Sequence, residues 1–230
     1  MDCRHITGVT DTAGVDEVNA AVAFADLAGF TALTEVHGDV LAADIAELLV
    51  SITNSVTVAG DRLVKAIGDA VLLTSPDAAS GISLVVRLFD ACEADPEFPD
   101  LRAGLHYGPV VERANDIFGS TVNIAARITA KAAGGQILMT GPIADSAAAS
   151  GQTIRALGPL SLRNFSEPVE LYKLVRTGVE DHNVDPVCRM RINPATSAGR
   201  LTYAGTDYLF CSLRCAAKFA AEPDRFTSPA

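Results

Sequence analysis

Two carboxylates in apolar surroundings are the first residues in the sequence that could do chemistry. Asp26 is the only charge in the apolar run 21–30, and Asp69 lies in the turn-like dipeptide Gly68-Asp69. A buried carboxylate costs free energy unless it is paired or binds a metal. Asp26 could instead cap a following helix, and Asp69 could serve only the turn. If neighbouring strands bring both to one end of a sheet, their charges repel unless a divalent cation lies between them.

A second group of polar residues has spacing that suits contacts to a phosphate group. Asn123 and Arg127 are four residues apart and share one face of an expected helix. Arg127 keeps its charge and can contact a phosphate bidentately, although a solvated polar helix face would give the same pattern. Lys65 precedes Asp69 by four residues, and in a strand an even separation places both side chains on the same side. The alternative for Lys65 is an ordinary edge-strand lysine.

Three of the five cysteines cluster near the C-terminus with the spacing C-x₂₂-C-x₃-C: Cys188, Cys211 and Cys215. Three thiolates suit Zn²⁺, Cu(I) or a similar thiophilic ion rather than Mg²⁺. The tail is too short for a large core, so a metal that stabilises it is one interpretation and a metal-sensing role is the other. The fourth ligand is open, with Asp185 and His182 as candidates or the position left unfilled. The other histidines have no ligand spacing and are interpreted as ordinary: His5, His37 and His106.

The composition of the 230 residues excludes several classes of protein. The chain is 49% hydrophobic and 20% charged, so it can bury enough apolar surface to fold. Its formal net charge of −10 disfavours non-specific electrostatic binding to nucleic acid or anionic lipid. The N-terminus has no signal-peptide core, and the apolar runs are too short to span a bilayer. We therefore expect a cytoplasmic protein with reduced thiols and with no nucleic-acid or membrane partner.

The periodicity of apolar residues predicts the elements that must position these side chains. It predicts a strand over 21–27 and two helices within 30–58, separated at His37-Gly38. Gly68-Asp69 predicts a tight hairpin between strands over 62–67 and 70–75. The later elements are helices over 76–95 and 119–133 and strands over 101–111, 136–140, 153–157 and 169–175. This order predicts an α+β fold with helices on one face of a mostly antiparallel sheet.

Four segments of the sequence resemble the signature segments of the class III nucleotidyl cyclases: FADLAGFT (24–31), KAIGDAVL (65–72), GLHYGPVV (104–111) and DIFGSTVNIAAR (116–127). They occur in the family's order and at its separations, and the resemblance runs from about residue 21 to 175. It implies a ferredoxin-like cyclase domain, with an antiparallel-rich sheet and helices packed on it. The short segment between Gly108 and Asp116 is similar to a bacterial subgroup with a trimmed dimerisation arm.

The resemblance implies a metal site and a base-recognition pair. Asp26 and Asp69 match the two aspartates that bind two Mg²⁺ or Mn²⁺ ions. Lys65 and Asp116 match the pair that contacts the adenine edge. Guanylyl cyclases typically have Glu and Cys at those two positions, so the resemblance implies ATP as the substrate.

The resemblance also implies contacts to the sugar and the phosphates. Asn123 matches the residue that orients the ribose, and Arg127 matches the residue that stabilises the transition state. Backbone N–H groups of residues 28–31, with Phe30 and Thr31 among the implied substrate contacts, enter a helix and could hold phosphates. Arg163 is similar in position to a basic residue that holds the triphosphate.

The tail resembles the YHS domain, a small TRASH-like metal-binding module, over about residues 185–226. The whole chain is therefore divided into an N-terminal extension (1–20), a cyclase domain (21–178), a linker (179–184) and a YHS-like domain (185–230). The tail carries none of the six matched polar residues. We therefore expect a chain that ends near Gly178 to retain any cyclising activity.

The leading hypothesis is an adenylate cyclase, a phosphorus–oxygen lyase that makes cyclic AMP and pyrophosphate for intracellular signal transduction. The family's catalytic centre lies between two cyclase domains. This chain has one such domain with all six residues, which implies a homodimer with two equivalent sites. The alternatives are a catalytically silent regulator that binds nucleotide or a partner, and a metal-binding protein that uses the cyclase domain as a scaffold.

Overall fold

The structure is a computed structural model that describes residues 17–162, 167–176 and 183–227. The large domain contains, in chain order, β1 (Glu17–Leu27), α1 (Phe30–His37), α2 (Asp39–Val56), β2 (Arg62–Ile67), β3 (Ala70–Ser75), α3 (Ala78–Glu93), β4 (Leu101–Arg113), β5 (Asp116–Phe118), α4 (Ser120–Thr129), β6 (Ile137–Thr140), α5 (Gly141–Ala149), β7 (Thr153–Leu160) and β8 (Val169–Val175). The small domain contains β9 (Asn183–Val184), β10 (Arg191–Ile192), β11 (Gly199–Tyr203), β12 (Thr206–Phe210), α6 (Leu213–Ala221) and α7 (Pro223–Thr227).

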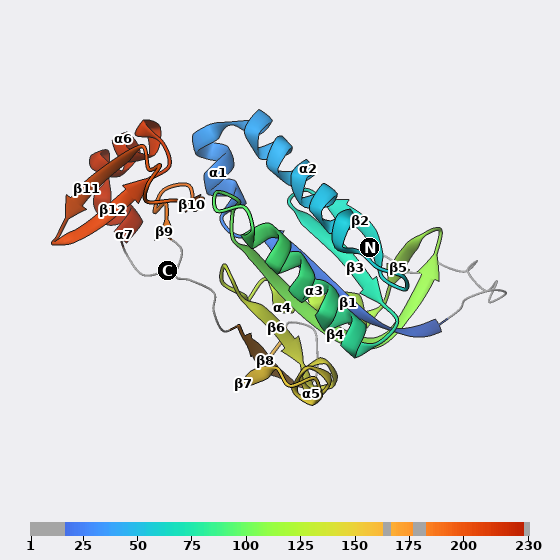
Figure 1. The fold of residues 1–230 in the computed structure, drawn as a ribbon. Coiled ribbons are helices and arrows are strands. Elements are labelled where there is room, and N and C mark those ends of the chain that lie inside the picture. The colour runs from blue at the N-terminus through green and yellow to red at the C-terminus, as the bar shows by residue number, and fades with distance from the viewer. Residues whose placement is uncertain (1–16, 163–166, 177–182, 228–230) are drawn as a thin grey trace, which may run out of the picture.

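The strands of the large domain form one sheet in the order β2-β3-β1-β4-β6-β8-β7, with β5 paired to β4 (Figure 1). Every pairing is antiparallel except that of β4 with β6. The predicted α+β class with an antiparallel-rich sheet is thus confirmed. Because β1 lies between β3 and β4, it is the strand whose end can meet groups from both neighbours.

The register of β1 places both isolated carboxylates at one end of the sheet. Asp26 lies opposite Ala70 of β3 on one side and Arg102 of β4 on the other. The β2–β3 hairpin turns at Gly68-Asp69, where Gly68 has a φ of 61°. Glycine adopts this left-handed conformation without steric cost. Asp69 is therefore next in sequence to the strand partner of Asp26.

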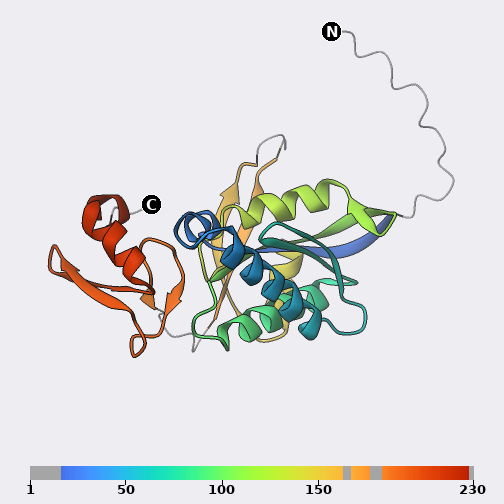
Figure 2. The ribbon, with the colours of Figure 1, turned by 90° about the horizontal axis from the view of Figure 1, so that it is seen from above.

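Helices cover both faces of the sheet. Along β1 the side chains alternate, so that Ala21, Ala23 and Ala25 are buried in the same cluster as residues of α2 and α3. Val22 instead belongs to the cluster that contains Ala125 of α4. Figure 2 shows α4 across the sheet from α2 and α3. The prediction that helices pack on one face was therefore wrong, because the apolar run of β1 buries both of its faces.

The predicted helix break and hairpin are confirmed by the element boundaries. Helix α1 ends at His37, and α2 starts at Asp39 after Gly38, which has a φ of 89°. Asp77 caps α3 by accepting a hydrogen bond from the backbone N–H of Ser80. Several boundaries differ from the prediction by a few residues. Strand β1 starts four residues earlier, at Glu17, and α4 ends at Thr129 instead of 133. Strand β7 runs on to Leu160 instead of ending at 157.

Two elements of the large domain were not predicted. Strand β5 has only three residues, which is too short for a periodicity to appear. Helix α5 follows Thr140 and has Pro142 in its first turn. Proline is enriched at this place in helices, so the sequence did contain a signal for α5.

The small domain has its own core, and it packs against α1 of the large domain. Phe210 and Phe219 form the centre of that core, with ring centroids 5.2 Å apart. Val36 of α1 belongs to the same buried cluster. Arg191 of β10 is 1% exposed and donates from Nε to the carbonyl of Phe98, at 2.5 Å, and from Nη2 to that of Cys92, at 2.8 Å. The two domains therefore share buried contacts.

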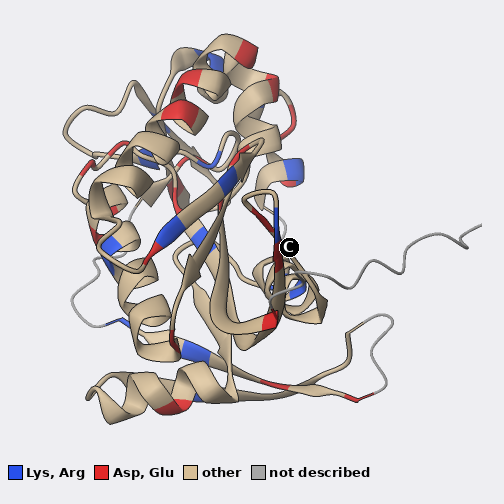
Figure 3. Cartoon of the chain, turned by 90° about the vertical axis from the view of Figure 1, so that its right-hand side faces the viewer, with Lys and Arg blue, Asp and Glu red and all other residues tan. Residues whose placement is uncertain are grey.

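Charged side chains of both signs are interspersed over helices and strand ends (Figure 3). Some of them join elements: Arg176, next to the end of β8, pairs with Asp90 of α3 at 2.5 Å and with Glu93 of the same helix. Within the described ranges, no helix is both long enough and apolar enough to cross a membrane.

Gly104 of β4 is a position where an added methyl group should cost much stability. A Cβ there would lie 2.3 Å from the backbone nitrogen of Thr129 and 2.8 Å from the carbonyl oxygen of Ala125. These are backbone atoms of α4, so Gly104→Ala should lower the free energy of unfolding by about 1–3 kcal/mol. Chemical denaturation measures this loss. Gly141→Ala is the matched control, because a Cβ there would meet nothing within 4 Å, and an equal loss in both variants would contradict the account.

Candidate active site and metal centre

Asp26 and Asp69 lie close enough for their charges to interact. Burial raises the pKa of Asp69, and the negative charge of Asp26 raises it further. Asp26 does not cap α1, because the N-cap position is Gly29 and no side chain caps this helix. The two carboxylates therefore form an oxygen-donor pair at the sheet end, of the kind that hard divalent cations prefer.

Arg102, which the sequence analysis did not single out, contacts Asp26 with two hydrogen bonds. Its Nε lies 2.5 Å from Oδ1 of Asp26 and its Nη2 lies 3.0 Å from Oδ2. This contact raises the pKa of Arg102. A carboxylate has about four lone-pair sites, so Asp26 can accept from Arg102 and still offer an oxygen to a cation. An arginine between two apolar residues near the start of β4 was the available signal.

Lys65 and Asp116, 51 residues apart in sequence, form an ion pair between β2 and β5. The Nζ of Lys65 lies 2.5 Å from Oδ2 of Asp116, and Oδ1 of Asp116 accepts the backbone N–H of Ile117 at 2.8 Å. The hydrogen bond from Lys65 lowers the pKa of Asp116. The two side chains are 42% and 28% exposed, so a ligand can reach them. A second ion pair, Arg62 with Glu112 at 3.1 Å, joins the same β2 edge to β4.

Asn123 and Arg127 lie on the side of α4 that faces away from the sheet. The buried side of this helix consists of Thr121, Ile124, Ala125, Ile128 and Thr129. Asn123 is exposed and Arg127 is partly exposed. The predicted shared helix face is confirmed, and it points outward from the sheet that carries Asp26 and Asp69.

The loop before α1 offers fewer backbone donors than the sequence predicted. The N–H of Ala28 donates to the carbonyl of Asp100 at 2.8 Å and is therefore used within the protein. Helix α1 begins at Phe30, and first-turn N–H groups such as those of Phe30 and Thr31 have no acceptor within their own helix. Gly29 has a φ of 82°, which suits glycine. Arg163, the expected triphosphate contact, lies outside the described residues.

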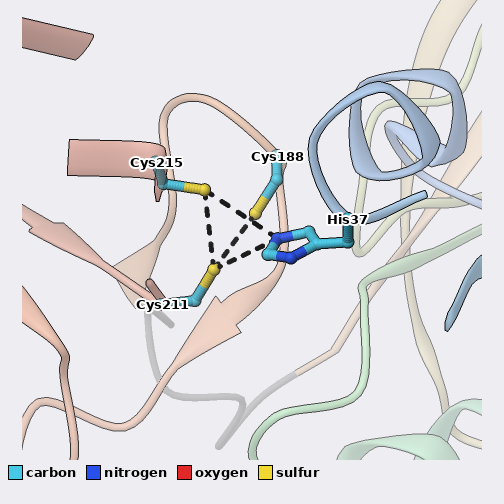
Figure 4. A group of neighbouring side chains, drawn as sticks. All are labelled: His37, Cys188, Cys211 and Cys215. Carbon is cyan, nitrogen blue, oxygen red and sulfur yellow. Dashed lines mark hydrogen bonds between the residues drawn. The ribbon is translucent and has the colours of Figure 1, made fainter. Parts of the chain in front are cut away.

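The three cysteines of the tail meet at one point, and a histidine from the large domain joins them (Figure 4). The ligand atoms of Cys188, Cys211, Cys215 and His37 all lie within 4.8 Å of one another. His37, which was interpreted as ordinary because it has no ligand spacing, thus belongs to a candidate metal-binding group. It stands 151 residues before Cys188, so sequence spacing could not have found it.

Asp185, a fourth-ligand candidate from the sequence, is not among these four residues and instead supports the backbone of the cluster. It is fully buried, and its carboxylate accepts the backbone N–H groups of Val187, Cys188 and Cys211 at 2.8, 3.2 and 2.9 Å. Burial raises the pKa of Asp185. The other candidate, His182, lies outside the described residues. Asp185 thus fixes the backbone that carries two of the cysteines, as outer-shell residues of metal sites do.

The family model for the adenylate and guanylate cyclase catalytic domain matches residues 15–176 of this chain. The chain belongs to this family. A second family model, the YHS domain, matches residues 183–230. The large domain described above is therefore the cyclase domain, and the small domain is a YHS domain.

Among curated proteins, the chain is 38% identical over 159 residues to a pH-sensitive adenylate cyclase of Mycobacterium tuberculosis, a match that covers 67% of this chain and 40% of that protein. It is 35% identical over 150 residues to an adenylate cyclase of Streptomyces griseus, covering 65% of this chain and 37% of that protein. The chain thus spans about two fifths of the length of these relatives.

Among solved structures, the chain resembles the adenylyl cyclase CyaB of P. aeruginosa with a TM-score of 0.63 and 20% identity, covering 73% of this chain and 100% of that one. It resembles the guanylyl cyclase Cya2 with a TM-score of 0.56 and 20% identity, covering 73% and 96%. Adenylyl and guanylyl cyclases thus share this fold, and the choice of nucleotide must come from side chains.

The contact between Arg102 and Asp26 generates a prediction about cation binding. Arg102→Gln removes a positive charge beside the carboxylate pair, so Mn²⁺ in the absence of nucleotide should bind about tenfold more tightly. The upward shift of the melting temperature with Mn²⁺ concentration measures the affinity. Arg155→Gln is the control, since Arg155 is an exposed arginine of β7. Unchanged or weaker Mn²⁺ binding in Arg102→Gln would contradict a cation site at Asp26 and Asp69.

Proposed function

We propose that this chain is an adenylate cyclase that converts ATP to 3′,5′-cyclic AMP and pyrophosphate. The observation that carries the choice of ATP is the 2.5 Å contact between Lys65 and Asp116. The pair places one positively charged donor and one negatively charged acceptor side by side, on partly exposed side chains of β2 and β5. Family membership and the names of the curated relatives support the reaction class.

The Lys65–Asp116 pair complements adenine and mismatches guanine. Lys65 can donate to adenine N1 while Asp116 accepts from the exocyclic amine. Guanine presents the reverse pattern, with O6 as an acceptor and N1–H as a donor, and would leave both side chains facing the wrong partner. A site built to hydrogen-bond one pattern rejects the other strongly, because its polar groups are then left unpaired.

The carboxylate pair fits the divalent cations that the cyclase family implies. Asp26 and Asp69 supply only oxygen atoms, the donors that Mg²⁺ and Mn²⁺ prefer, and the charge of Asp26 raises the pKa of Asp69. When bound, two such ions would acidify the ribose 3′-hydroxyl and neutralise the β- and γ-phosphates. Asp26 and Asp69 would hold these ions at the end of the sheet, beside the first turn of α1.

The remaining residues orient the nucleotide and meet its developing charge. The 3′-oxygen forms a bond to the α-phosphorus, the bond from that phosphorus to the leaving pyrophosphate breaks, and the hydroxyl proton is released. Asn123 orients the ribose, and Arg127 meets negative charge on the α-phosphate. Phe30 and Thr31 offer backbone N–H groups to the phosphates at the start of α1.

Two chains are needed to build each site in this proposal. Asn123 and Arg127 point away from the sheet that carries their own Asp26 and Asp69, as their exposed side of α4 requires. A second copy of the chain can bring its carboxylates to this face. Because one chain carries all six residues, a symmetric homodimer has two equivalent sites.

Exchange of the base-recognition pair tests the choice of nucleotide. The double variant Lys65→Glu/Asp116→Cys should lose ATP turnover by up to roughly 10⁴-fold, because the hydrogen-bonding pattern no longer matches adenine. The measurement is kcat/KM for ATP and for GTP with Mn²⁺ present.

The neighbouring ion pair provides the control for this exchange. Arg62→Gln/Glu112→Gln removes the ion pair between β2 and β4 and should leave the ratio of ATP to GTP turnover unchanged. Equal use of ATP and GTP by the unaltered chain would refute the assignment of Lys65 and Asp116.

Complementation between two inactive variants tests the shared site. Asp26→Ala and Arg127→Ala homodimers should each lose about 10²–10³ in rate, the cost of one transition-state contact. An equal mixture that exchanges subunits should recover about one quarter of the unaltered activity, because half of the dimers then hold one intact site of two.

The mixture requires proof that chains exchange, which native mass spectrometry of two differently tagged variants gives. Asp26→Ala mixed with Asp69→Ala is the matched control and should stay inactive, since both changes fall in the same half of each site. Recovery in this control, or no recovery in the first mixture despite exchange, would rule out the composite site.

A further inference from the structure

Four ligand atoms converge from two domains that are far apart in sequence (Figure 4). His37 is the last residue of α1 in the cyclase domain. Cys188 lies between β9 and β10, Cys211 follows β12, and Cys215 lies in the first turn of α6. This convergence is distinct from the Asp26–Asp69 pair, because it offers sulfur and nitrogen rather than oxygen.

Four of the six distances between these ligand atoms are close to the edges of a tetrahedral metal site, and the other two are within 4.8 Å. The Sγ of Cys211 lies 3.4 Å from that of Cys188 and 3.7 Å from that of Cys215. The Nε2 of His37 lies 3.5 Å from Sγ of Cys211 and 3.9 Å from Sγ of Cys215. For bonds of about 2.3 Å to sulfur and about 2.0–2.1 Å to nitrogen, tetrahedral edges are about 3.8 Å between sulfurs and about 3.5 Å between sulfur and nitrogen.

A disulfide does not account for the cluster. The two Sγ–Sγ distances of Cys211 are far longer than the roughly 2.05 Å of an S–S bond. A disulfide would also leave one thiol and the imidazole without a role. Ordinary packing of buried thiols does not explain why the polar edge of His37 points at two of them.

The backbone around the cluster is fixed by further hydrogen bonds. Asp185 accepts the N–H groups of Cys188 and Cys211, and the side chain of Ser212 accepts the N–H of Cys215 at 3.2 Å. All three cysteine positions are thus held by polar contacts of their own backbone. Such outer-shell support is typical of metal sites that hold one geometry.

We propose that His37 completes a Cys₃His site for a thiophilic divalent ion, best matched by Zn²⁺, and that this ion ties the YHS domain to α1 of the cyclase domain. With four protein ligands the site is closed, so the ion holds structure and does no chemistry on a substrate. The metal site does not depend on the proposed adenylate cyclase activity.

A route for the ion exists beside the cluster. His37 and Cys211 both line a hollow of about 280 Å³ that also contains Met190 and Ser212. Residues of both domains line this space, so it lies between them. An entry path is one of the requirements of a metal site.

The ion would act at one end of a helix whose two ends both contact the YHS domain. Near the C-terminal end of α1, Arg214 donates to the carbonyl of Val36 at 2.5 Å. At the N-terminal end, a Cβ on Gly29 would lie only 2.5 Å from Cβ and Cγ of Arg189, so Arg189 packs directly on Gly29. Arg189 follows the ligand Cys188 in sequence.

The same helix begins at Phe30, four residues after Asp26, and presents Phe30 and Thr31 to the proposed phosphate position. Occupancy of the Cys₃His site therefore fixes the placement of α1 and, through it, the proposed active site; this second step rests on the proposed function. This coupling also argues against the expectation that a chain ending near Gly178 retains its full cyclising activity. Such a chain would lack every contact described here between the YHS domain and α1.

Metal content and coordination test the site itself. The purified full-length chain should contain one equivalent of Zn²⁺, and X-ray absorption at the zinc edge should give three sulfur neighbours and one nitrogen neighbour. His37→Ala should lose more affinity than the roughly 10–100-fold that an outer-shell change costs. His182→Ala and Cys3→Ser are the controls and should keep the metal.

Two results would overturn the metal site. One is a coordination shell of three sulfurs with no nitrogen in the unaltered chain, which does not depend on any variant being folded. The other is equal Zn²⁺ affinity in His37→Ala and the unaltered chain. Loss of metal in His182→Ala with retention in His37→Ala would assign the fourth ligand to the linker and would equally refute the role of His37.

Hydrogen exchange tests the coupling without an activity assay. Removal of Zn²⁺, or His37→Ala, should speed amide exchange in residues 30–38, and His182→Ala should not. Activity gives a second readout. In the Zn²⁺-free chain and in His37→Ala, with excess Mg²⁺ present, kcat/KM for ATP should fall by about tenfold or more. The reason is that a displacement of a substrate-binding group by about 1 Å can cost about 10²-fold in rate. Unchanged exchange in α1 would refute the coupling, whereas absence of turnover in every form would refute only the proposed function.

Discussion

The repulsion between Asp26 and Asp69 is the constraint on which the rest of the site depends. Strand β1 lies inside the sheet, between β3 and β4, and the β2–β3 hairpin turns beside its end, so the two carboxylates meet there. Arg102 offsets only part of this charge, because it contacts Asp26 and not Asp69 through hydrogen bonds. Two close carboxylates that are only partly neutralised favour the binding of a cation between them. In the proposed homodimer, Asn123 and Arg127 of one chain face the carboxylates of the other.

Helix α1 connects this site to the proposed Cys₃His site. Its first turn follows the carboxylate strand, and its last residue, His37, contacts two cysteines of the YHS domain. Arg191 adds a buried anchor, since its guanidinium donates to two backbone carbonyls of the cyclase domain. The YHS domain is thus a neighbour of the proposed phosphate-binding turn rather than a separate appendage.

Local signals predicted the parts of the fold that local interactions determine. The Gly68-Asp69 hairpin and the break at His37-Gly38 follow from glycine conformations, and both were predicted in place. Packing on both sheet faces was missed, although the unbroken apolar run of β1 indicated it. Arg102 and His37 could not be predicted from spacing, because strand pairing and domain packing bring them to their partners. The roles of the six matched residues stay predictions from the resemblance.

The most direct test of the account is the product formed from ATP by the purified full-length chain. With Mn²⁺ present, the account predicts cyclic AMP and pyrophosphate in equal amounts, and at least about 100-fold less of both from Asp26→Asn, which keeps the shape of the side chain but loses its charge. Chromatographic separation of the nucleotides with parallel pyrophosphate detection gives both quantities. No cyclic AMP from the folded, dimeric chain, or equal amounts from Asp26→Asn, would contradict the account.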